Sequence, residues 1–176
     1  MRNVLLWVFF LGIASPQLQA ADATLLQQVF VVKQAFPNVK TIGVLCHTIH
    51  AAAILKEMGV ACTAYQLNLR IAHTETLQDV REGFERMVKS DKIDMIWVLP
   101  DDVTDQKFGR RFLSEKCMLM KIPLYVHSPE YVREGALLAV APDGTGALRI
   151  YFNAKVGEML SLTLPAEVTS KILNVE

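Results

Sequence analysis

Apolar runs rich in β-branched residues alternate with longer segments of helical periodicity between residues 38 and 135. Residues 41–46 and 94–99 are nearly continuous apolar runs, which is typical of parallel strands covered by helices on both faces. The alternation predicts an α/β fold: a single doubly wound lobe with a mainly parallel sheet. Sheets of this kind bind ligands beside the carboxyl ends of their strands, where the strand order reverses. The same pattern therefore predicts a fold and the edge that holds a site.

The remaining elements follow from local signals for caps, turns and buried stripes. In chain order we expect a helix over 24–36, a helix over 49–58 that ends at Gly59, a strand over 60–67, a helix over 75–89 capped by Thr74, a helix over 105–120, a strand over 123–126, a helix beginning after Ser128, a C-terminal β-hairpin made by 136–140 and 147–152, and helical structure over 166–173. The expected order of the first four strands is 2-1-3-4. The outer hairpin strand would leave an edge that another subunit could extend.

The first 20 residues have the character of a secretory signal peptide. Arg2 precedes an apolar run over 4–13, which is shorter than the roughly 20 residues that a membrane-spanning helix needs. We therefore expect a cleaved signal over 1–20 and a periplasmic protein, with an uncleaved anchor as the alternative. The rest is divided into an N-terminal helix over 21–37 and a single α/β lobe over 38–176.

Charge and cysteine content exclude some functions and leave others open. Lys plus Arg equals Asp plus Glu, at 18 each, so the chain lacks the basic surface that nucleic acids require. Cys46, Cys62 and Cys117 are an odd number, so at least one thiol stays unpaired within the chain. Because Cys46 ends the first expected strand and Cys62 begins the second, we expect the two to lie too far apart for a disulfide. Buried free thiols are the favoured state.

Polar residues follow the first, third and fourth expected strands, and this set is our candidate ligand-binding site. It consists of His47, Thr48, His50, Asp101, Asp102, His127 and Ser128. The two adjacent acids favour a small ligand with an amino group or another cation. The start of the helix expected over 49–58 favours a carboxylate instead, because its N–H groups point outward.

A metal site and a catalytic site are the alternatives at this edge. Cys46, His47, His50, Asp101 and His127 offer nitrogen, sulfur and oxygen donors. A His-x-x-His spacing across a turn does not place both rings on one helical face, so solvated or capping histidines are favoured and no metal or cofactor is expected. A cysteine at the end of an apolar strand is more often a small buried hydrophobe than a nucleophile. We therefore expect a protein that is not an enzyme.

Four ordered segments carry a resemblance to a known family. Residues 36–45, 93–102, 121–126 and 132–137 resemble the second lobe of the ABC-transporter substrate-binding protein family, which has a type I periplasmic-binding fold. The resemblance implies a flavodoxin-like or periplasmic-binding-like lobe that acts as an exported, non-enzymatic binding protein. In that family the turns after the strands contact the ligand. It also implies two lobes, so a membrane protein or a second lobe, supplied by homodimerisation, is an expected partner.

The C-terminal part has a second resemblance. Residues 134–138, the hairpin and residues 147–153 look like the ending of YfiR-like periplasmic proteins. Those are small single-lobed α/β proteins, and this resemblance implies a regulatory or accessory module that acts by protein-protein binding. It stands as the alternative function.

Overall fold

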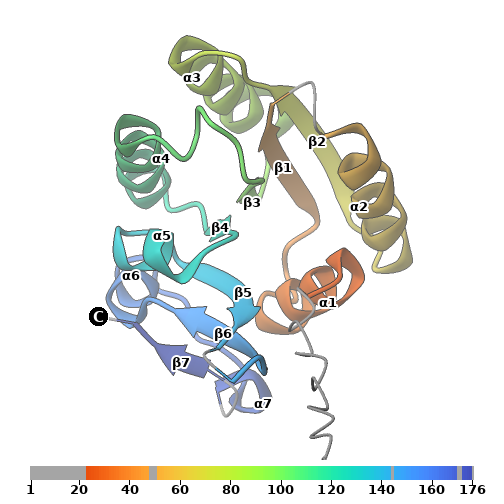
Figure 1. Ribbon diagram of the computed structural model, residues 1–176, viewed down its shortest axis with the longest axis vertical. Helices are drawn as coiled ribbons and strands as arrows, with labels where there is room; N and C mark the ends of the chain where they lie inside the picture. The colour runs from red at the N-terminus through yellow and green to blue at the C-terminus, as the bar shows by residue number, and fades with distance from the viewer. Residues whose placement is uncertain (1–22, 48–50, 144, 170–171, 176) are drawn as a thin grey trace, which may run out of the picture.

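The computed structural model describes residues 23–47, 51–143, 145–169 and 172–175. They form a seven-stranded sheet in the order β2-β1-β3-β4-β5-β6-β7 (Figure 1). The strands are β1 (Thr41–Cys46), β2 (Asn68–His73), β3 (Met95–Val98), β4 (Leu124–Val126), β5 (Leu138–Pro142), β6 (Leu148–Phe152) and β7 (Ile172–Asn174). Every neighbouring pair is parallel except β5 and β6. The predicted doubly wound lobe, its strand order and its hairpin are confirmed.

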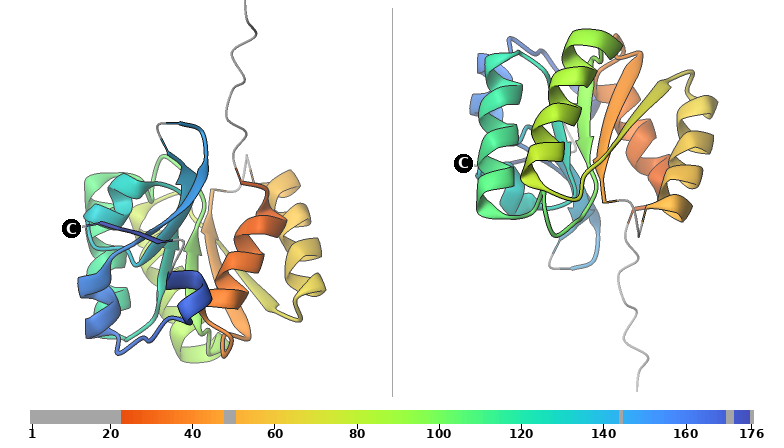
Figure 2. Two further views of the ribbon diagram at one scale, coloured as in Figure 1. Left: turned by 90° about the horizontal axis from the view of Figure 1, so that it is seen from below. Right: turned by 90° about the horizontal axis from the view of Figure 1, so that it is seen from above.

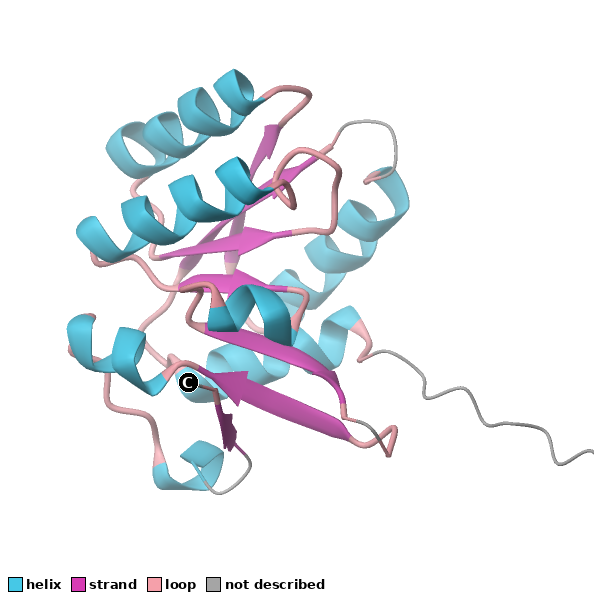
Figure 3. Cartoon of the chain, turned by 60° about the vertical axis from the view of Figure 1, so that its left-hand side comes forward, coloured by secondary structure: helices cyan, strands magenta, loops and turns pink. Residues whose placement is uncertain are grey.

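Helices cover both faces of the sheet, as the two views of Figure 2 show. The helices are α1 (Leu25–Ala35), α2 (Ala52–Ala64), α3 (Leu77–Arg86), α4 (Lys107–Leu119), α5 (Pro129–Arg133), α6 (Ala154–Met159) and α7 (Ala166–Thr169), and the π-helical turn Met87–Asp91 extends α3. One core cluster packs α1, α2 and α7 against the sheet, and the other packs α3, α4 and α5 against its opposite face. Figure 3 shows the strands stacked between these layers.

Aromatic packing joins α1 to the middle of the sheet. The rings of Trp97 on β3 and Tyr125 on β4 lie 3.9 Å apart between centroids, and both side chains are buried. The Tyr125 hydroxyl donates to Oε1 of Gln28 on α1 at 2.8 Å. Trp97 is therefore a core residue, as expected, and α1 is part of the lobe.

The second strand lies later in the chain than its predicted range over 60–67. That range is the end of α2 and the turn after it, because the helix continues past Gly59 and buries Met58, Ala61 and Cys62 along one side. The predicted Gly59 cap and the placement of Cys62 on a strand are therefore wrong. A positive φ of 56° at Gln66 ends the turn, and Asn68 N–H then bonds Lys40 C=O as β2 begins.

The boundaries at two other places also differ from the prediction. Thr76 rather than Thr74 caps α3, through a reciprocal pair of hydrogen bonds with Asp79. Helical structure over 166–173 stops at Thr169, and β7 follows because its backbone pairs with β6. As a result β6 has neighbours on both sides, and the prediction that the hairpin leaves a free edge is wrong. The edge strands are β2 and β7.

Two further predictions concern cysteines and membrane insertion. Cys46, Cys62 and Cys117 are buried free thiols, as expected. Over the described part of the chain, the helices are too short or too polar to cross a bilayer. The expected signal peptide lies outside the described residues.

Candidate ligand-binding site

A cavity of about 430 Å³ opens at the carboxyl edge of the sheet, beside the ends of β1 and β3 and the start of α2. After β1 the chain enters the α1–α2 layer, and after β3 it enters the α3–α4 layer, so the cavity lies at the switch point of the sheet. It is lined by Cys46, His47, Ala51, Ile54, Leu99, Pro100, Asp101, Asp102 and Asp105. Its volume falls within the range of about 300–1,000 Å³ that is usual for small-molecule sites.

Asp101 is fixed by the loop that follows β3. Its Oδ1 accepts hydrogen bonds from the backbone N–H groups of Val103 at 2.7 Å and Thr104 at 2.6 Å. Its Oδ2 is buried and has no hydrogen-bond partner among the described residues. One carboxylate oxygen therefore shapes the loop, and the other is left for a ligand donor.

Asp102 and Asp105 add two more carboxyl groups to the same cavity. Asp102 is exposed at the mouth, whereas Asp105 is half-buried. Burial raises the pKa of Asp105, and the opposing influence of His127 and Arg110 does not fully offset it. The cavity thus concentrates acidic groups on one wall.

His127 and Arg110 lie behind Asp105. Nε2 of His127 is 3.4 Å from Oδ2 of Asp105, and Nη2 of Arg110 is 3.8 Å from its Oδ1. Burial lowers the pKa of His127, although Asp105 acts in the opposite direction. Arg110 also reaches Glu134 at 3.4 Å, so this basic group is already shared between acids. His127 and Arg110 thus hold the carboxyl group of Asp105 in place in the cavity.

The N-terminus of α2 places partial positive charge beside the cavity. The first N–H groups of a helix lack acceptors within the helix, and Ala51, the residue before α2, has no side chain that can accept from them. Ala51 and Ile54 both line the cavity. A negatively charged group on this side would interact favourably with the helix N-terminus.

The thiol of Cys46 lies at the inner end of the cavity. Burial, with a further contribution from Asp101, raises its pKa to about 11. Its Sγ is 3.9 Å from Nδ1 of His73 on the neighbouring strand. At neutral pH the group is therefore a thiol rather than a thiolate, which is the wrong form for a nucleophile.

A second hollow of about 510 Å³ adjoins the first. The two share Ile54, Leu99 and Pro100. The second hollow extends between the start of α1 and β5, where it is lined by Gln28, Glu57, Trp97, His127 and the residues Val140, Ala141 and Pro142. The strip of apolar surface from Ile54 to Val140 can accommodate an apolar part of a ligand whose polar part occupies the first cavity.

The structure brings together some of the predicted site residues and separates others. His47, Asp101 and Asp102 line the first cavity, and His127 lines the second hollow. Ser128 instead caps α5, because its Oγ accepts from the backbone N–H of Tyr131 at 3.3 Å. Thr48 and His50 lie outside the described residues. The assignment of these residues to ligand binding stays a prediction.

Sequence reasoning missed Asp105 and Ile54 as site residues. A signal for Asp105 was present, since it follows Asp101 by four residues within the same connection after β3. No comparable signal existed for Ile54, whose position depends on where α2 begins. Within the described residues, no cluster of three or more His, Cys, Asp or Glu side chains has the geometry of a metal site.

A comparison with protein families identifies the type of protein. A family model described as ABC transporter substrate binding protein matches residues 20–146. No curated protein gives a significant match.

Three solved structures are similar in fold. A conserved domain protein from Vibrio cholerae matches with a TM-score of 0.76 and 19% identity, over 89% of this chain and 62% of its own. An ABC domain in complex with L-Trp from Streptococcus pneumoniae matches with a TM-score of 0.73 and 21% identity, over 87% and 62%. The ligand-free, open structure of a substrate-binding protein with adhesive properties from Clostridium difficile matches with a TM-score of 0.74 and 18% identity, over 88% and 60%.

The chain therefore spans less than two thirds of the length of the proteins whose fold it shares. At these identities the likeness establishes the fold alone. None of these matches supports the resemblance to YfiR-like proteins.

Proposed function

The chain belongs to the family of ABC transporter substrate-binding proteins, and we propose that it binds a small zwitterion, such as a free amino acid, in the cavity at the switch point. The observation that carries the proposal is the buried Oδ2 of Asp101, which has no hydrogen-bond partner among the described residues and lies in a cavity that the start of α2 also lines. Family membership supports a binding role rather than catalysis.

The two walls of the cavity suggest how such a ligand would lie. An ammonium group would donate to Oδ2 of Asp101 and lie close to Asp102 and Asp105, where the negative charge is concentrated. A carboxylate would lie toward the N-terminus of α2. The side chain of the ligand would then extend over Ile54 and Leu99 into the second hollow. The L-Trp bound to the Streptococcus pneumoniae relative is a zwitterion with an apolar side chain and is the first probe to test.

We further propose that residues 1–20 direct export and that the protein works outside the cytoplasmic membrane, where substrate-binding proteins of this family typically act. The lobe alone would leave one side of the ligand facing solvent, because the second hollow and the first cavity both open at the sheet edge. A membrane protein, or a second lobe, is the partner that would cover it. Affinity for the isolated lobe should accordingly be modest.

The test is calorimetric titration with L-Trp and a panel of other amino acids, followed by the matching amines and acids that lack one charged group. A zwitterion site binds the amino acid more tightly than both its decarboxylated amine and its deaminated acid. Asp101→Asn should weaken binding of the best ligand by roughly 10- to 100-fold, because Asn keeps Oδ1 for the loop and removes the charge at the second position.

The matched control is Glu82→Gln, which removes an exposed acid on α3 away from the cavity and should leave affinity unchanged. Equal affinity of the wild type and Asp101→Asn for their best ligand would contradict the site. Failure of the wild type to bind any amino acid, amine or acid in the panel would contradict the ligand class.

A further inference from the structure

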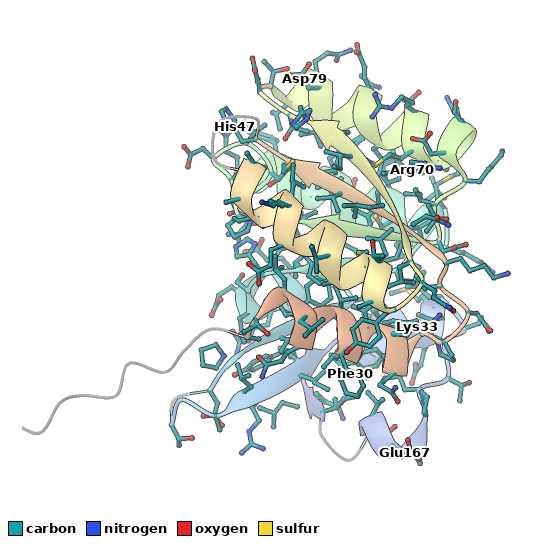
Figure 4. All side chains as sticks on the ribbon, turned by 90° about the vertical axis from the view of Figure 1, so that its right-hand side faces the viewer. Phe30, Lys33, His47, Arg70, Asp79 and Glu167 are labelled. Carbon is teal, nitrogen blue, oxygen red and sulfur yellow. The ribbon has the colours of Figure 1, made fainter. Side chains whose placement is uncertain are left out.

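The outer surface of the α1–α2 layer exposes several apolar side chains and carries few charges. We define the α1–α2 face by Leu26, Phe30, Ile54, Val60 and Tyr65, which lie on the two helices or follow them directly. Figure 4 views the molecule from the side of these two helices and labels Phe30. The side chains of Leu26, Phe30, Ile54 and Val60 are 48%, 45%, 37% and 67% exposed. Over its eleven residues α1 has one charged side chain, Lys33, and over its thirteen residues α2 has two, Lys56 and Glu57.

The two helices approach each other at both of their ends. The rings of Phe30 and Tyr65 lie 5.9 Å apart between centroids, which joins the end of α2 to the middle of α1. At the other end of the two helices, Leu25 and Ile54 line the same hollow. Of the thirteen residues of α2, Met58, Ala61 and Cys62 are buried and Leu55 packs against the core, so the core does not account for the exposed Ile54 and Val60. Exposed apolar side chains on helices with few charges make this face a candidate binding surface.

The edges of the sheet offer a poorer route to association. On β2, the C=O of Leu69 accepts from Nη1 of Arg70 at 3.2 Å, and the C=O of Ile71 accepts from Nη2 of Arg86 at 2.9 Å. Guanidinium groups thus occupy acceptors that an added strand would need. The other edge strand, β7, has only three residues. A helix face is therefore the better candidate for an interface.

We propose that the α1–α2 face binds the same face of a second copy of this chain, around a two-fold axis near Lys56 and Glu57. An interface of this type must be complementary to itself. Lys56 and Glu57 are adjacent, exposed and opposite in charge, and neither has an ion-pair partner among the described residues. An antiparallel crossing of two α2 helices pairs each lysine with the glutamate of the other copy.

The other charge on this face is already satisfied within the chain. Nζ of Lys33 donates to the C=O groups of Pro37 at 2.9 Å and Val39 at 3.2 Å. The face therefore carries a net charge of only +1, from Lys33, Lys56 and Glu57, which does not select a strongly charged partner. Lys56 and Glu57, which have no ion-pair partner among the described residues, match those of a symmetry mate. Gly59 has no atom within 4 Å of the position of an added Cβ, which leaves room for a second helix to approach α2.

The proposed dimer does not require the ligand site to be correct, but it has a consequence for it. Ile54 belongs both to the α1–α2 face and to the two hollows at the sheet edge. A second copy on this face would therefore lie beside the mouth of the ligand cavity. Dimerisation would add cover on the α2 side, which the lobe by itself leaves open.

The test measures the mass of the protein in solution across a range of concentrations, by sedimentation equilibrium, after expression from the full sequence. We expect a concentration-dependent monomer–dimer equilibrium. Val60→Glu should raise the dimer dissociation constant at least about tenfold, because it places a charge in the apolar interface. Lys56→Glu should also weaken the dimer by setting carboxylates opposite each other, and Lys56→Glu with Glu57→Lys should restore it.

The matched control is Leu119→Glu on α4, where the side chain is 73% exposed but lies in the opposite layer. It should leave the dissociation constant unchanged. A wild-type chain that stays monomeric up to high micromolar concentration overturns the proposal, as does equal weakening by Val60→Glu and Leu119→Glu. A dimer that the double charge exchange fails to restore overturns the placement of the axis. Circular dichroism spectra of all variants separate loss of association from loss of folding.

Discussion

The two helical layers cover opposite faces of one sheet, and their inner sides are alike while their outer sides are not. Both bury aliphatic side chains against the strands. On the outside, α3 and α4 carry exposed ion pairs, including Lys89 with Glu85 at 2.9 Å and Arg111 with Glu115 at 2.7 Å. The α1–α2 face has no ion pair between described residues. Both layers expose apolar side chains, Val60 and Phe30 on this face and Phe108 and Leu119 on α4, so the difference lies in the charges.

The comparison distinguishes the residues that a helix needs for packing on the sheet from those that depend on what contacts its outer side. Any helix on this sheet needs an apolar inner stripe, so the inner sides converge. A helix that faces water gains solubility from charges, whereas one that faces another protein loses affinity with each charge left unpaired. The scarcity of charge on α2 is therefore informative in a way that its buried residues are not.

The largest expected effect is on stability, at a pair of glycines that occupy helices in the two layers. A Cβ added to Gly109 on α4 would lie 2.6 Å from the backbone oxygen of Val103, and backbone cannot move aside cheaply. Gly109→Ala should destabilise the fold by about 2 kcal/mol, taking about 3 for overpacking less about 1 for helix propensity. At Gly59 on α2 nothing lies within 4 Å, so Gly59→Ala should stabilise by about 0.5–1 kcal/mol.

Urea unfolding at one fixed protein concentration measures both variants, because any association would make apparent stability depend on concentration. Opposite signs are the expected result. If Gly109→Ala were also stabilising, the close packing of α4 on the loop that carries Asp101 would be wrong. If Gly59→Ala were destabilising, α2 would pack more closely against a neighbour than the lobe itself provides.

The same contrast explains which elements could be predicted from the sequence. The stripe of α3, with Val80 and Phe84 buried and charges around them, has helical periodicity and was located to within a few residues. In α2 the sequence from Val60 to Ala64 is apolar or small on every side, so periodicity could not distinguish helix from strand. The residues that misled the sequence interpretation are among those that make the α1–α2 face apolar.

The site was predicted only as far as the strand ends allowed. His47, Asp101 and Asp102 follow β1 and β3 directly, so correct strands placed them at one edge. The roles of Ser128 as a cap and Asp105 as a wall depend on how connections fold after the strands end, which strand patterns do not encode. β7 was missed because three residues that pair by backbone contact with β6 carry little local signal.

A smaller effect is expected on the pH dependence of stability, and it comes from His127, which lies beside Asp105. Burial lowers the pKa of His127 beneath its ordinary value near 6.5, against the opposing charge of Asp105. The unfolded chain then binds more protons than the folded one as pH falls through about 6.5, so stability should decrease on acidification in that range. For a single titrating group, the free energy of unfolding changes by less than about 1.4 kcal/mol per pH unit.

Urea unfolding between about pH 5.5 and 7.5 tests this, with His127→Gln as the comparison. The variant should show a shallower dependence than the wild type. Asp105 has a raised pKa, so its effect has the opposite sign and acts over a range that extends upward from its ordinary value of about 3.9. Parallel curves for wild type and His127→Gln would mean that His127 is not held neutral by the fold. Neither α1 nor α2 contains a histidine, so these helices should not contribute to the pH dependence of stability in this range.

The smallest expected effect distinguishes charged residues that stabilise the fold from charged residues that only contact solvent. Lys89 pairs with Glu85 on the exposed side of α3, where side chains gain little from pairing, so Lys89→Ala should leave the urea midpoint unchanged. Arg86, one turn earlier, donates to the C=O of Ile71 on the edge strand, so Arg86→Ala should cost about 0.5 kcal/mol and promote aggregation through the uncovered edge. If Lys89→Ala cost as much as Arg86→Ala, the charges on α3 would be part of what holds the helix. Their scarcity on α2 would then reflect tighter packing on the sheet rather than a partner at the α1–α2 face.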